Sequence, residues 1–154
     1  MKEREAINIV TMFHATLLIA VTPLATSLSY PAHSQEMIPL EKALVDSSPG
    51  YFPTRCAALF NALLAWIGEE RMGEEKWISM NSAVTFLMEV AEAVIQENMK
   101  ASPEAARNIV VRDTANIRDL YIERMKRNYA AQGQAFGRDS LFLSDLQLCK
   151  LLLS

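Results

Sequence analysis

The fold is decided by the stretch at residues 53–72, PTRCAALFNALLAWIGEERM, which combines a helical apolar pattern with one of the two cysteines of the chain. Its apolar residues recur at spacings of three and four, at Cys56, Leu59, Phe60, Leu63 and Ile67. This period is that of an amphipathic α-helix with one apolar face. Proline suits the first turn of a helix and glycine suits its end, so Pro53 and Gly73 bound the predicted helix.

Three further helices are predicted after this first one. The second covers about residues 74–99 and has an acidic first turn, which complements the positive start of a helix. The third begins after Ser102, an N-cap residue followed by Pro103, and runs to about Gln132. The last covers about residues 144–153. Residues 35–52 precede the four helices as an irregular arm, with a short helix at Leu40–Val45.

The sequence therefore predicts an all-α fold, a small up-and-down four-helix bundle over residues 53–154. In such a bundle the first and last helices are antiparallel neighbours. Cys56 lies at the start of the first helix and Cys149 near the end of the last, both on apolar faces. We therefore predict a disulfide between them, which would stabilise the domain by roughly 4–5 kcal/mol through loop-closure entropy.

A disulfide is not the only role that the two cysteines could have. A catalytic cysteine needs a neighbour that lowers the pKa of its thiol. Arg55 is adjacent in sequence, but consecutive helix residues point about 100° apart. The chain contains no C-x-x-C redox motif. Buried free thiols and a redox or nucleophilic cysteine stay as alternatives to the disulfide.

The first 34 residues have the pattern of a signal peptide. The charged start MKERE is followed by residues 7–28, which include no Asp, Glu, Lys or Arg, and then by small residues around His33. This order predicts a signal peptide over residues 1–34, cleaved between Ser34 and Gln35, and a protein of the bacterial periplasm or exterior. The alternatives are an uncleaved membrane anchor through residues 7–28, a cytosolic helix, and a shorter leader starting at Met12.

Cleavage would remove both histidines, His14 and His33, from the chain. Histidine is the usual general base and a common metal ligand, so a mature chain without it excludes Ser-His-Asp and Cys-His catalysis and histidine-bound metals. The sequence has no glycine-rich phosphate-binding motif. The net charge of −3 argues against nucleic acid as a partner.

The other polar groups do not form a motif that predicts catalysis. The acidic residues around the turn at 69–75 and the pair Glu89 and Glu92 are interpreted as solvated, and the methionines as core residues. We therefore predict no catalytic residue, metal or cofactor, and expect a non-catalytic binding or protein-interaction role with an unidentified protein partner. The alternative is a small-molecule carrier or a histidine-free enzyme, which converging Asp113, Glu89 or Tyr121 would favour.

Overall fold

The structure, a computed structural model, describes residues 37–153. Within this range it contains no strand. Its helices are α1 (Leu40–Ala43), which continues into a 3₁₀ turn at Leu44–Asp46, α2 (Tyr51–Ile67), α3 (Glu69–Met72), α4 (Glu74–Met99), α5 (Pro103–Gln132) and α6 (Ser140–Leu151). The prediction of an all-α fold is confirmed.

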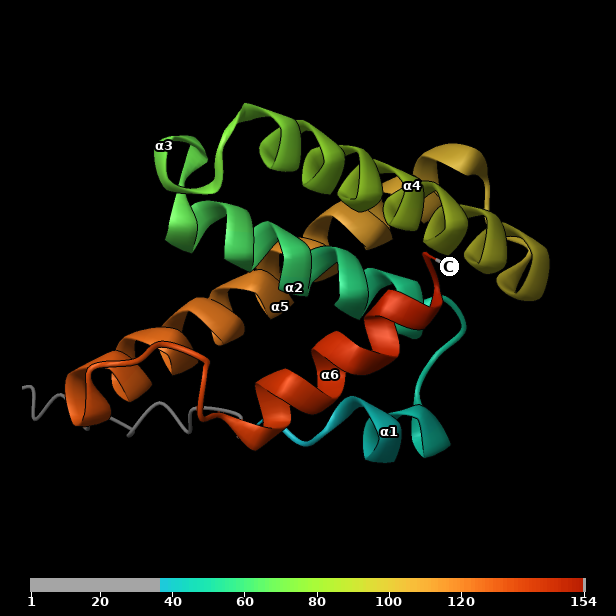
Figure 1. Ribbon diagram of the computed structural model, residues 1–154. Coiled ribbons are helices and arrows are strands. Elements are labelled where there is room, and N and C mark those ends of the chain that lie inside the picture. Colours follow the sequence, from blue (N-terminus) through green and yellow to red (C-terminus); the bar gives the residue numbers. More distant parts are fainter. Residues whose placement is uncertain (1–36, 154) are drawn as a thin grey trace, which may run out of the picture. The chain divides into compact units, whose positions relative to one another are not determined.

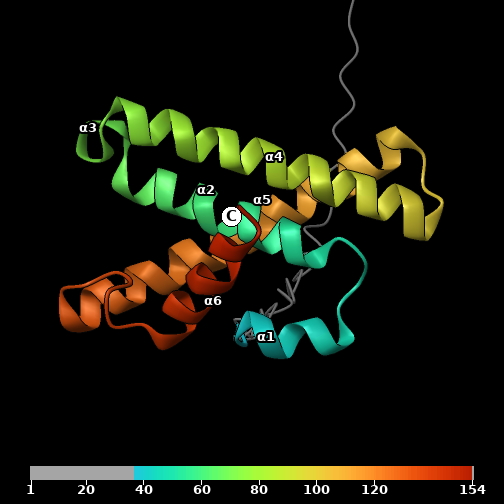
Figure 2. The same ribbon diagram turned by 45° about the vertical axis from the view of Figure 1, so that its right-hand side comes forward.

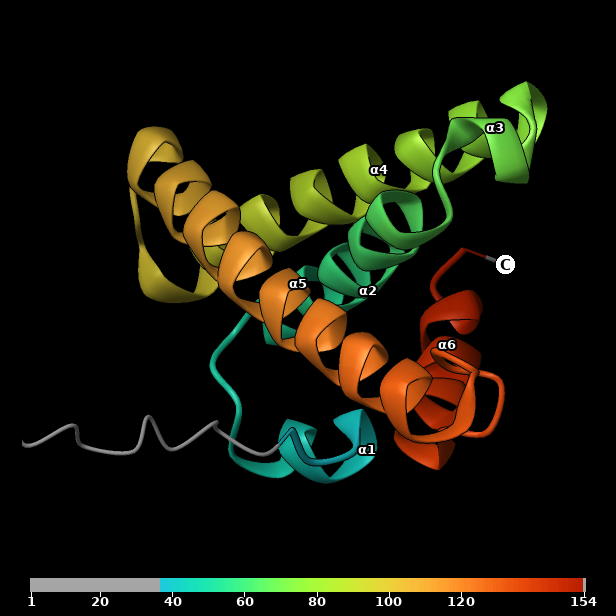
Figure 3. The same cartoon turned by 90° about the vertical axis from the view of Figure 1, so that its left-hand side faces the viewer.

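Helix α2 is the central element of the domain. In Figures 1 and 2, α4 lies along one side of α2, while α1 and α6 lie on the other. Figure 3 shows α5 crossing α2 on the way from the end of α4 to α6. Residues 53–60 are buried without exception, so the first half of α2 is covered on all sides. The small side chains of Ala57, Ala58 and Ala62 let the neighbouring helices approach closely.

Two predicted helix ends are wrong, and each has a local cause. The helix predicted over residues 53–72 is two helices, because Gly68 takes a backbone conformation with φ of 77° that ends α2. The last helix begins at Ser140 rather than at residue 144, because the carboxylate of Asp139 accepts hydrogen bonds from the first amides of α6. The predicted ranges of α4 and α5 agree with the structure, and the Ser102 cap is present.

The predicted disulfide is confirmed. Cys56 and Cys149 are bonded, with their Cα atoms 5.3 Å apart and a sequence separation of 93. Both side chains are fully buried, and the bond ties the start of α2 to the end of α6.

Two finer predictions stay predictions. The first is the four-helix up-and-down bundle. Its fourth helix would be α6, which is short, with 12 residues against 26 in α4 and 30 in α5, and which packs mainly on α1 and α2. The signal peptide at 1–34, with its cleavage between Ser34 and Gln35, is the other, since it lies outside the described residues.

Among the described helices, α4 alone is long and apolar enough to span a bilayer by length and composition. Core helices of soluble proteins meet the same criterion. One side of α4 packs into the domain through Val84, Leu87, Ala91 and Ile95. Its opposite side leaves Ile78 and Phe86 about half exposed.

Gly50→Ala is expected to destabilise the domain by roughly 2–5 kcal/mol, judged by urea unfolding. Gly50 caps α2 with a φ of 81°, and an added Cβ would lie 2.8 Å from Cγ1 of Ile95 in α4. The matched control is Gly133→Ala, because Gly133 also has a left-handed conformation (φ 69°) but open space around it. The control is expected to cost about 1–2 kcal/mol. Equal costs for the two variants would contradict the contact with α4.

Candidate functional site

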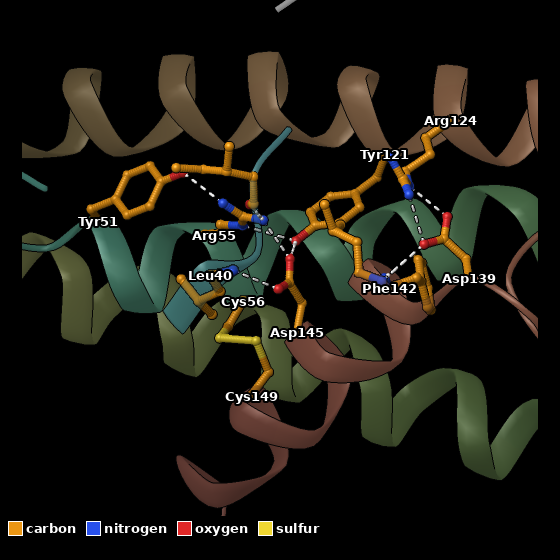
Figure 4. A network of polar contacts seen from close by, with 12 residues as sticks. Leu40, Tyr51, Arg55, Cys56, Tyr121, Arg124, Asp139, Phe142, Asp145 and Cys149 are labelled. Atoms are coloured by element: carbon orange, nitrogen blue, oxygen red, sulfur yellow. Dashed lines mark hydrogen bonds and ion pairs between the residues drawn. A yellow bond between two sulfur atoms is a disulfide. The ribbon is translucent and has the colours of Figure 1, made fainter. Parts of the chain in front are cut away.

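Arg55, near the start of α2, lies at the centre of a buried network of polar contacts (Figure 4). Its side chain is 1% exposed, and its Nη2 lies 2.5 Å from Oδ2 of Asp145, which is fully buried in α6. Its Nε donates to the hydroxyl of Tyr121 in α5 at 3.0 Å. That hydroxyl in turn donates to Oδ2 of Asp145 at 2.5 Å. We call these residues and their partners the Arg55 network.

The network also holds the arm that precedes α2. Nη2 of Arg55 donates to the carbonyl of Ile38 at 2.6 Å, and the amide of Leu40 donates to Oδ1 of Asp145 at 2.7 Å. Nη1 of Arg55 donates to the hydroxyl of Tyr51 at 3.0 Å. The network therefore joins the arm, α2, α5 and α6. The two buried charges are paired and hydrogen-bonded, as burial of charge requires.

The surroundings of Arg55 and Tyr121 in the network shift the pKa values of these two side chains upward. Burial, the largest cause, and the neighbouring Asp145 raise the pKa of Tyr121 well above its usual value, although Arg55 opposes this. Burial alone lowers the pKa of Arg55, but its contacts with Tyr121, Asp145 and Tyr51 outweigh burial and raise it. Tyr121 is therefore a neutral phenol near neutral pH, unsuited to act as a base. The arrangement is that of a structural anchor.

The Arg55 network was not predicted from the sequence, in which Arg55 stands out only as a neighbour of Cys56. One pattern could have indicated it. Arg55 is the only charged residue between positions 51 and 68, and Asp145 is the only one between positions 140 and 149. An isolated charge in an otherwise apolar helix is expected to be buried and paired. The two isolated charges are of opposite sign, and each lies within four residues of a bonded cysteine.

A second, smaller network fixes the start of α6. Arg124 in α5 holds the carboxylate of Asp139 with two hydrogen bonds, Nε to Oδ2 at 2.5 Å and Nη2 to Oδ1 at 2.9 Å. Asn128 donates to the same carboxylate at 2.6 Å. Partial burial, the largest single cause, raises the pKa of Asp139, but the hydrogen bonds from Arg124, Asn128 and the Phe142 amide together hold it below its usual value.

The lowered pKa of Asp139 predicts that the stability of the fold depends on pH. A carboxyl group whose pKa is lower in the folded state stabilises the fold above its unfolded pKa of about 3.9, and this stabilisation is lost as the pH falls through the folded value. Asp139→Asn keeps an N-cap residue but loses the ion pair. We expect it to cost about 1–2 kcal/mol at pH 7, and progressively less as the pH falls below about 3.9, measured by urea unfolding over a pH series. A cost independent of pH would contradict a stabilising role for the ionised carboxylate of Asp139.

The residues expected to mark an enzyme site do not converge. Tyr121 belongs to the Arg55 network, and Asp113 pairs with Arg112 at the surface at 2.8 Å. Glu89 is exposed on α4. Thr114 is buried (3% exposed), and its Oγ1 is the only buried side-chain polar atom without a hydrogen-bond partner in residues 37–153. The polar spot suggested by Asp113 and Thr114 is thus one buried hydroxyl beside a surface ion pair.

Thr114→Val is expected to stabilise the protein by about 1 kcal/mol, because it removes a buried hydroxyl without a partner and keeps the shape of the side chain. Thermal unfolding gives the measurement. The control is Thr85→Val on α4, where the hydroxyl is exposed and donates to the carbonyl of Asn81 at 3.1 Å. The control is expected to stay within about 0.5 kcal/mol of the wild type. A destabilised Thr114→Val protein would refute the prediction.

A pocket of about 680 Å³ lies between α2, α3, α4 and the end of α6, and we call it the α2–α4–α6 pocket. Its volume falls within the usual range for small-molecule sites. Apolar side chains form most of its lining. They are Phe60, Ile67, Met72, Met80, Ala83 and Leu153.

Charged side chains also line the α2–α4–α6 pocket. Arg71, Lys76 and Lys150 contribute positive charge, and Glu75 is the one acidic residue of the lining. All four are exposed. The pocket therefore combines an apolar interior with a mainly basic rim.

Two other hollows are smaller. One of about 370 Å³ lies beside Tyr51 and Arg55 of the Arg55 network. The other, of about 490 Å³, is a shallow hollow along the outer side of α4 between Trp77 and Glu89.

Comparisons of the chain with protein-family models, with curated proteins and with solved structures give no match.

Proposed function

We propose that this chain is an exported, non-catalytic binding protein and that the α2–α4–α6 pocket is its ligand site. The observation that carries the proposal is the apolar lining of this pocket, which is larger than the hollows beside Tyr51 and along α4. Ligand sites in proteins are concave and mostly apolar, with a few polar groups that orient the ligand. The separation of Tyr121, Asp113 and Glu89 supports binding over catalysis.

The disulfide supports the part of the proposal that concerns export. Disulfides form and persist in oxidising compartments and are rare in the cytosol. We propose that residues 1–34 are a signal peptide and that Gln35 begins the mature chain. The intact mass of the protein recovered from the periplasm or medium tests this. A mass without residues 1–34 is expected, and a mass that includes them would contradict cleavage.

The binding proposal can be tested with a neutral apolar fluorophore, N-phenyl-1-naphthylamine, whose emission rises in an apolar site. The wild type is expected to bind it. Ala83→Phe should weaken binding about tenfold or more, because the added ring occupies the α2–α4–α6 pocket. The matched control is Ala93→Phe, also on α4 but exposed and outside the pocket, which should bind like the wild type. Equal binding by both variants would place the site elsewhere.

A protein partner is the second candidate function, favoured by the half-exposed Ile78 and Phe86 on the outer side of α4. Both side chains line the same hollow along α4, and an exposed apolar patch on a helix is a common feature of protein interfaces. Capture of a single exported protein by the wild type, lost in Phe86→Ser and kept in Ala83→Phe, would favour this candidate. Capture that is insensitive to Phe86→Ser would argue against an interface on α4.

A further inference from the structure

We infer that the α2–α4–α6 pocket takes an amphiphile with an apolar chain and an anionic head group. This inference rests on the proposed function, because it assigns a ligand class to the same pocket. It requires an interior that accepts an alkyl chain and a rim that attracts negative charge. The structure has features that suit each requirement.

The interior is suited to a flexible alkyl chain. Phe60 and Ile67 contribute the α2 side of the lining, while Met72 and Met80 contribute from α3 and α4. Methionine side chains are unbranched and adapt to apolar ligands of different shape. The side chain of Ala83 is small, so this part of the α4 wall leaves room for the chain of a ligand.

The rim has a local charge opposite to that of the whole protein. The full chain has a net charge of −3, yet three cationic side chains and one carboxylate line this pocket. None of Arg71, Lys76 and Lys150 forms an ion pair with a carboxylate in the part of the chain that the structure describes. Their charges are therefore available to an anion.

Arg71 is also held in place at the rim. Its Nε donates to the carbonyl of Ile67 at 2.6 Å, and its Nη2 donates to the carbonyl of Trp66. These contacts fix the guanidinium at the end of α2, beside the pocket. A cation that is already positioned loses less side-chain entropy when it binds an anion. Lys76 and Lys150 approach the pocket from α4 and α6.

The test compares ligands that share a ten-carbon chain and differ in the head group. Decanoate, decyl phosphate, 1-decanol and decyltrimethylammonium are each used to displace N-phenyl-1-naphthylamine from the exported protein, with the charged compounds below their micelle concentrations and 1-decanol below its solubility. We expect decanoate and decyl phosphate to displace the probe at concentrations about tenfold lower than 1-decanol, and the cation to displace it least. Acetate and inorganic phosphate, which lack the chain, should displace nothing.

Charge reversal locates the head group. The double variant Lys76→Glu/Lys150→Glu should weaken decanoate binding about tenfold or more and change 1-decanol binding less than about twofold. The control is Lys42→Glu/Arg127→Glu, which changes the net charge equally at exposed positions outside the pocket. It should bind decanoate nearly as the wild type does.

The outcomes separate this inference from the proposed function. The preference for an anionic head group is wrong if 1-decanol competes as well as decanoate, or if the Lys76/Lys150 variant binds decanoate normally. Neither result contradicts the apolar ligand site of the proposed function. If the fluorophore does not bind and none of the decyl compounds protects the protein against thermal unfolding, the proposed function itself fails. Binding of inorganic phosphate as tightly as decyl phosphate would contradict the inference that the ligand is an amphiphile, and would indicate a site for anions without an apolar chain.

Discussion

Asp145→Asn is expected to lower the free energy of unfolding by about 3–5 kcal/mol. The carboxylate is fully buried, and it neutralises the guanidinium of Arg55 from 2.5 Å while also accepting from Tyr121 and the amide of Leu40. Asparagine keeps the size of the side chain but leaves the charge of Arg55 uncompensated. Small domains have a total stability of about 5–15 kcal/mol, so the loss is a large share of it. Urea unfolding measures it.

A double-mutant cycle separates the ion pair from simple loss of packing. Arg55→Met and Asp145→Leu are each expected to be strongly destabilising, because each leaves one buried charge alone. The double variant should cost less than the sum of the two by about 2 kcal/mol or more. Tyr121→Phe, which removes only a hydroxyl, should cost about 1–2 kcal/mol. Additive costs for Arg55 and Asp145 would refute the coupling.

Replacing both cysteines by alanine is expected to lower the free energy of unfolding by about 2–5 kcal/mol. The bond between Cys56 and Cys149 closes a loop with a sequence separation of 93, so its loss frees a large part of the unfolded chain. Urea unfolding of the variant and of the wild type, with and without dithiothreitol, gives the measurement.

Dithiothreitol supplies the internal control for the disulfide. The reductant should lower the stability of the wild type to about that of the Cys56→Ala/Cys149→Ala variant and leave the variant unchanged. A wild type whose unfolding midpoint does not respond to complete reduction would contradict a stabilising role for the disulfide.

The parts of the fold that the sequence predicted depend on local patterns. Ser102 and Pro103 define the start of α5 through capping, and glycine defines the ends of α3 and α5. The disulfide was also predictable, because an apolar period placed each cysteine on an inward face near opposite ends of the helical domain. Such patterns need only neighbouring residues to be recognised.

The features that local sequence patterns do not predict depend on contacts between residues far apart in the chain. Arg55 and Asp145 are 90 residues apart in the sequence. If α2 is taken as an amphipathic helix with one apolar face, Arg55 does not lie on that face. The structure instead covers the first half of α2 on every side. The α2–α4–α6 pocket was equally hidden, because its rim combines Arg71, Lys76 and Lys150 from three helices. No local pattern brings these residues together.

The central claim, that the α2–α4–α6 pocket binds an anionic amphiphile, is tested most directly by the methyl resonances of the methionines. Met72 and Met80 line the pocket, whereas Met125 is fully buried in α5 and Met99 lies at the far end of α4. Titrating methyl-labelled protein with decanoate should shift the resonances of Met72 and Met80 in a saturable manner and leave those of Met99 and Met125 nearly unchanged. Saturable shifts elsewhere with Met72 and Met80 unaffected, or no shift at all, would contradict the claim.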